Sequence, residues 1–104
     1  MKTIVRFEFD TQLFYPEYEG PQNIIFENPP HIPQTGDPVN FKISDFFSDE
    51  KVIRAFEELE DGNLFYAERL QATYSREEIE VIVVVYEEAI FKGLFPHLFA
   101  STLV

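Results

Sequence analysis

The chain has 104 residues, of which 45% are hydrophobic and 16% aromatic, enough for one packed core but too few for two. It contains no cysteine, which excludes disulfides, thiolate catalysis and cysteine-based metal centres and fits a cytoplasmic protein. Nineteen Asp and Glu against eight Lys and Arg give a net charge of −11, which opposes direct binding to nucleic acids and anionic membranes.

The N-terminal residues show no signal for export. They alternate like a strand and lack the continuous apolar stretch of a secretory leader. The longest apolar run, residues 81–86, is far shorter than the roughly 20 residues that cross a bilayer. We therefore expect a soluble protein with one domain over residues 1–104.

The first half of the chain predicts three strands. In residues 3–9, Val5, Phe7 and Phe9 share one face, which is the period of a half-buried strand. Residues 23–27 predict a short strand before a proline-rich stretch. A turn at residues 36–38 then leads into a third strand over residues 39–43.

Residues 48–61 predict the one clear helix, with Val52 and Phe56 at helical spacing, Ser48 as N-cap and Gly62 at the C-terminal end. Acidic residues crowd its last turn, although the helix dipole is negative there. A solvent-exposed face explains them, and an acidic binding surface is the alternative. The residues are Glu57, Glu58, Glu60 and Asp61.

A hairpin is predicted in the second half, with residues 64–74 pairing with residues 79–87. In its first strand, Leu64, Tyr66, Leu70, Ala72 and Tyr74 are expected on the apolar side. Its second strand is apolar on both faces, so we expect the core to cover one face and the helix or a partner chain to cover the other.

The C-terminal stretch, residues 89–104, has apolar pairs every four residues but is interrupted by Gly93 and Pro96. We expect a strand or irregular segment through Phe95, followed by a helical turn that begins at Pro96. This stretch is either a wall of the core or a surface for self-association.

These elements predict an α+β fold. Its sheet is an antiparallel one of about five strands, strongly bent or partly closed, with the helix at residues 48–61 packed on it.

No catalytic constellation, metal site or cofactor motif is found in the sequence. The two histidines, His31 and His97, lie in irregular segments, and a site would need them to meet a carboxylate. Glu68 is the single acid on an apolar strand face, and we expect it to reach water or to pair with Arg69 or Lys42.

The loop at residues 14–19 is the predicted binding feature. Its aromatic residues offer a large contact area, and its acids suit a basic groove on a partner. Alternatively, the aromatics fold back as a lid over an open sheet edge. The residues are Phe14, Tyr15, Glu17, Tyr18 and Glu19.

Three functions remain open from sequence. The leading hypothesis is a non-enzymatic module that binds a basic protein through this loop and self-associates as a homodimer through residues 79–87 or the C-terminal stretch. The second is an inhibitor that mimics nucleic acid and occupies the basic groove of a DNA- or RNA-binding protein, as phage-encoded inhibitors do. The third is a small enzyme that uses a carboxylate or a histidine.

Overall fold

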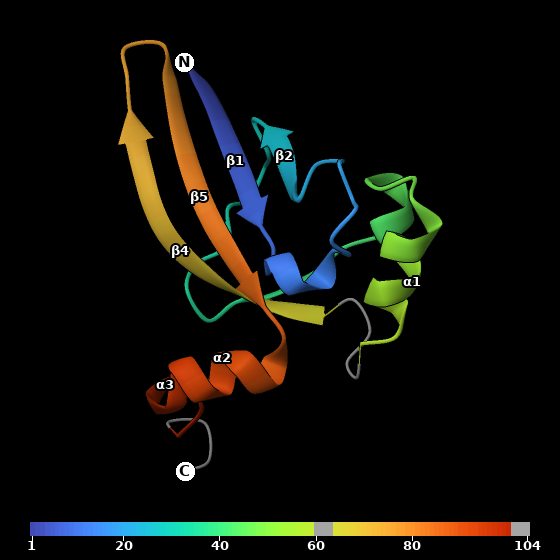
Figure 1. Cartoon of the computed structure of the whole chain (residues 1–104). Helices are drawn as coiled ribbons and strands as arrows, with labels where there is room; N and C mark the ends of the chain where they lie inside the picture. Colours follow the sequence, from blue (N-terminus) through green and yellow to red (C-terminus); the bar gives the residue numbers. More distant parts are fainter. Residues whose placement is uncertain (60–63, 101–104) are drawn as a thin grey trace.

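The protein has an α+β fold in which a strongly curled five-stranded sheet forms a half-barrel with helices packed on it (Figure 1). The computed structural model describes residues 1–59 and 64–100. The strands are β1 (Lys2–Glu8), β2 (Asn23–Glu27), β3 (Pro38–Asn40), β4 (Leu64–Tyr74) and β5 (Glu78–Tyr86). The helices are α1 (Glu50–Glu57), α2 (Glu88–Leu94) and α3 (Pro96–Ala100), with short 3-10 turns at Thr11–Leu13 and Ile43–Asp45.

The sheet has the strand order β2-β1-β5-β4-β3 and is mixed. Three neighbouring pairs are antiparallel, but β1 and β5 run parallel, with Val5 beside Val81 and Phe7 beside Val83. The expectation of an antiparallel sheet throughout is therefore wrong. A parallel pair needs a long crossover, and here everything between β1 and β5 supplies it. The bent sheet and the fold class are confirmed.

The hairpin of β4 and β5 is confirmed, but the predicted faces of β4 are wrong. Phe65 and Ala67 are buried, whereas Leu70 and Tyr74 are 57% and 75% exposed. A bulge between Arg69 and Gln71 shifts the pairing by one residue. It breaks the alternation that the sequence suggests, because a bulge inserts an unpaired residue into one strand.

The helix α1 is shorter than predicted. It begins at Glu50, and Asp49 rather than Ser48 caps it, since the Asp49 carboxylate accepts hydrogen bonds from the N–H groups of Lys51 and Val52 at 2.9 and 3.3 Å. Val52 and Phe56 point into the core, as their spacing predicts. Gly62, the expected C-terminal residue, lies outside the described residues.

The C-terminal stretch is helical earlier than expected. Residues 88–94 form α2 instead of a strand or irregular segment, and Phe91 packs its ring against Tyr66 and Tyr86 at 5.5 and 6.3 Å. The helix α3 begins at Pro96, as predicted. The strand expected over residues 39–43 is also shorter, because the chain turns away from β4 after Asn40.

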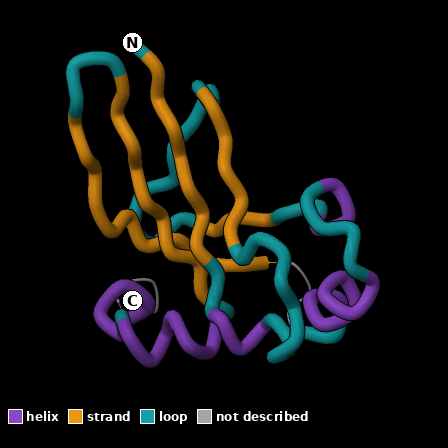
Figure 2. The backbone as a smooth tube through the Cα atoms, turned by 45° about the horizontal axis from the view of Figure 1, so that its top comes forward, coloured by secondary structure: helices purple, strands orange, loops and turns teal. Residues whose placement is uncertain are grey.

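The core lies on the concave side of the sheet and is built mainly from phenylalanine rings. Phe9 is at its centre, with the rings of Phe41, Phe56 and Phe65 between 5.2 and 5.5 Å away in edge-to-face geometry. Residues of β1, β4 and β5 meet here with α1, which Figure 2 shows on the side of the molecule opposite the hairpin. No helix in residues 1–59 and 64–100 is long and apolar enough to cross a membrane.

Candidate functional site

A groove lies between the two edge strands of the half-barrel. The sheet curls without closing, so among residues 1–59 and 64–100 no strand pairs with the outer side of β2 or of β3. Residues from both strands line a single groove of about 530 Å³. This volume is typical of small-molecule and peptide sites, which are concave and mostly apolar.

Four phenylalanines form the floor and rim of the groove. Phe7 and Phe41 are buried at its floor, with ring centroids 5.1 Å apart. At the rim, the rings of Phe26 and Phe46 lie 5.5 Å apart, and Phe46 is 37% exposed. A ligand in the groove therefore meets aromatic surface that the core does not fully cover.

The segment that follows β2 forms one wall of the groove. Its prolines at positions 29, 30 and 33 have no N–H to offer a strand ladder and hold the chain extended. At one end, Asn28 exchanges two hydrogen bonds with the Thr3 backbone at 2.7 and 2.8 Å. At the other, the Arg69 guanidinium donates to the carbonyl groups of Ile32 and Pro33 at 2.9 and 3.1 Å. The wall is thus anchored at both ends.

The groove also carries polar and charged side chains between its phenylalanines. Its polar lining consists of Glu27, Asn28, His31, Asn40, Lys42 and Asp45. The described residues contain no group of three or more His, Cys, Asp or Glu side chains that could hold a metal ion. His31 lies in the groove wall, 3.9 Å from a carboxylate oxygen of Asp37, whereas His97 lies in α3 against the ring of Phe95.

The aromatic residues of the predicted binding loop are largely internal. Phe14 is only 6% exposed and packs on Phe47 and Phe56. It therefore belongs to the core and is not part of the surface that the loop offers to a partner. Tyr18 stacks on Phe14 and donates its hydroxyl to the Pro21 carbonyl at 2.7 Å. The loop folds back on the core, as the alternative reading expects, but it covers the α1 side of the molecule.

The acidic residues of the predicted site are divided. Glu17 and Glu19 stay exposed on the loop, and Glu57 and Glu58 are exposed at the end of α1. The remaining two, Glu60 and Asp61, lie outside the described residues.

Glu68 is partly buried and has a different partner from the ones expected. Its carboxylate accepts a hydrogen bond from the Tyr86 hydroxyl at 2.9 Å. Burial, together with this carboxylate, raises the pKa of Tyr86 to about 12. The pair joins β4 to β5 on the convex side, and Asp10 also acts electrostatically on Tyr86.

Tyr15 joins the loop to α1 through a charged hydrogen bond. Its hydroxyl donates to the Asp49 carboxylate that also caps α1. This bond lowers the pKa of Asp49, helped by the N–H groups of Val52 and Lys51, and it raises the pKa of Tyr15 to about 12. A carboxylate that is stabilised in the folded state contributes to stability above its unfolded pKa and loses that contribution as the pH falls.

We expect Tyr15→Phe to lower the free energy of unfolding at pH 7, because it removes the bond to Asp49. The difference from wild type should narrow in acid, as the pH falls below the ordinary Asp pKa of 3.8 and through the lowered one. It should also narrow in base between pH 10 and 12, where the raised pKa of Tyr15 ends its contribution. Urea unfolding across this pH range measures both. Tyr74→Phe, at a 75% exposed tyrosine, is the control, and a pH-independent difference would refute the coupling.

The groove was missed in the sequence because its lining comes from four separate segments. The signals present were the proline-rich run at residues 29–33 and phenylalanines at positions 26, 41 and 46. These residues come together in one groove only in the folded chain, where β2 pairs with β1 beside the core. No family model matches this chain, and no curated protein or solved structure is significantly similar to it.

Proposed function

We propose that the protein is a non-enzymatic interaction module that holds an extended apolar segment of a partner protein in the groove between β2 and β3. The supporting observation is the combination of two free strand edges with an aromatic floor between them. The contact surface proposed from sequence thus moves from the loop at residues 14–19 to this groove.

An extended segment fits because it can use both kinds of surface. In the described part of the chain, β2 (five residues) and β3 (three residues) have no strand neighbour on their outer sides, where every second residue turns its backbone groups outward. Pro38 offers only its C=O there, and a partner strand can add to such edges. Alternate side chains of that strand point to one side, towards Phe26, Phe41 and Phe46. Backbone pairing provides affinity, and the aromatic pocket selects apolar side chains.

The negative charge of the protein favours partners whose apolar segment is flanked by basic residues. The groove lining carries Glu27 and Asp45 against Lys42, and the whole chain carries −11. Lys or Arg residues flanking the apolar segment would be attracted, which raises the association rate more than the affinity. We place this interaction in the cytoplasm, because a chain without cysteine forms no disulfide and therefore needs no oxidising compartment.

Panning a random peptide library on the protein tests this proposal. We expect the selected peptides to share alternating apolar residues flanked by basic ones. We also expect Phe46→Asp to weaken their binding by about thirtyfold, the loss typical of removing a central aromatic anchor. Calorimetry on the selected peptides measures the effect.

Leu94→Asp is the matched control, because Leu94 is an exposed apolar residue outside the groove lining. It should leave peptide binding unchanged. Peptides that bind Phe46→Asp as tightly as wild type would contradict the proposal. If such binding were also lost on adding salt and competed by nucleic acid, the mimicry hypothesis would replace it.

A further inference from the structure

The second half of β4 has an outer edge that no described residue covers. β3 pairs only with Leu64–Tyr66, and the turn before it continues as far as Arg69. There, the N–H groups of Ala67 and Arg69 donate to the Asp37 carbonyl and the Thr35 hydroxyl at 2.9 and 3.0 Å. In residues 1–59 and 64–100, no backbone hydrogen bond reaches the outer side of residues 70–74.

This uncovered stretch is nevertheless a regular strand. Beyond the bulge, Gln71 to Tyr74 pair with β5 without a further shift. Figure 1 shows this end of the hairpin projecting away from the helices, next to the N-terminus. Its side chains are exposed, including Leu70 and Tyr74. A row of N–H and C=O groups is thus held in strand geometry and open to another chain.

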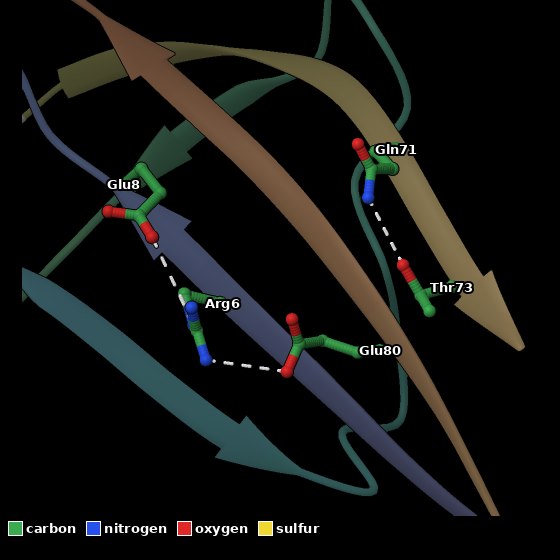
Figure 3. A network of polar contacts seen from close by, with 5 residues as sticks. All are labelled: Arg6, Glu8, Gln71, Thr73 and Glu80. Atoms are coloured by element: carbon green, nitrogen blue, oxygen red, sulfur yellow. Dashed lines mark hydrogen bonds and ion pairs between the residues drawn. The ribbon is translucent and has the colours of Figure 1, made fainter. Parts of the chain in front are cut away.

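The stretch also lacks the residues that usually protect such an edge. Its sequence, L-Q-A-T-Y, holds neither charge nor proline, although 26% of the chain is charged. Gln71 donates its side-chain amide to the Thr73 hydroxyl at 3.1 Å, so the two polar side chains are partnered to each other (Figure 3). In the same figure, the charged residues Arg6, Glu8 and Glu80 form their network on the neighbouring strands β1 and β5.

We propose that a second copy of the chain pairs with this edge, antiparallel, with the two Ala72 residues at the two-fold axis. The two sheets then continue into one. This interface differs from the ones expected from sequence, which placed self-association at residues 79–87 or in the C-terminal stretch, and it is separate from the groove.

Two observations favour a second copy as the occupant. Two chains of net charge −11 repel each other over most of their surfaces, but residues 70–74 meet without any charge. The antiparallel arrangement also places Leu70 opposite Tyr74 of the second copy, so that two exposed apolar side chains cover each other. A two-fold interface makes this contact twice.

Light scattering on the full chain tests the proposal. We expect wild type to have the mass of a dimer and Ala72→Glu that of a monomer, because the substitution sets two carboxylates against each other at the axis. Ala72 is exposed in the single chain, so the variant should keep its circular dichroism spectrum. Ser44→Glu, an equal change of charge at an exposed position outside β4, should remain a dimer.

A disulfide gives a second readout. The chain has no cysteine, so Ala72→Cys carries a single thiol, and opposed strand residues lie within disulfide distance. Mild oxidation should cross-link it much faster than Ser44→Cys. A monomeric wild type, or a dimer that survives Ala72→Glu, would overturn the proposal. Ala72→Glu should still bind groove peptides, so the two proposals fail separately.

Discussion

Replacing Phe56 with alanine should lower the free energy of unfolding by about 3 to 5 kcal/mol, the usual cost of removing a phenylalanine from a core. Phe56 is fully buried, and its ring lies 5.2 Å from Phe9, 5.7 Å from Phe47 and 5.9 Å from Phe65. Phe56 connects α1 to the sheet, so its removal would leave a cavity between the helix and the sheet. Because domains of this kind have roughly 5 to 15 kcal/mol of stability, most of it could be lost.

Urea unfolding followed by circular dichroism measures this change. Leu94→Ala removes an aliphatic side chain that is 54% exposed and should change the free energy of unfolding by less than about 0.5 kcal/mol. Equal effects of the two substitutions would show that α1 does not pack on the sheet through Phe56.

A carboxylate in the middle of β5 should prevent folding. Val83 is fully buried on the concave face, beside Phe7 of β1 in the strand register. Its other neighbour is Arg69 of β4, whose guanidinium is already bonded to two backbone carbonyls of the groove wall. Val83→Asp would bury a charge away from water at a cost of several kcal/mol, comparable to the stability of the whole domain. Loss of the cooperative thermal transition is the expected result.

Ile82→Asp, the same change one residue away, is the matched control. Ile82 lies on the convex face and is only partly buried, with Arg6 beside it on β1. The new carboxylate could reach water and the guanidinium, so the variant should fold with a modest loss of stability. If Ile82→Asp were the more damaging substitution, the assignment of the two faces would be reversed.

Strand positions were predictable from sequence where one face is buried. Alternation located β1 and β5 correctly because Val5, Phe7, Val81 and Val83 follow the pleat of the sheet without interruption. The partner of each strand was not predictable, because alternation carries no information on neighbours or direction. The parallel pairing of β1 and β5 therefore appeared only in the structure.

Local devices explain the other differences. The bulge at Leu70 reverses the faces of β4 within one residue, and nothing in the run of apolar residues marks it. In α2, Gly93 suggested a break, but it lies near the helix end with open space around it. Phe14 and Tyr15 looked like a contact surface because sequence does not distinguish an aromatic loop in solvent from one packed on the core.

Backbone amide chemical shifts of the protein with a library-selected peptide test the central claim most directly. The groove account predicts shifts concentrated in β2, β3 and the wall at residues 29–33, with protection of β2 amides that are free in the unbound protein. Shifts confined to the loop at residues 14–19 or to the end of α1, with β2 and β3 unaffected, would contradict it and return the binding surface to the acidic side of the molecule.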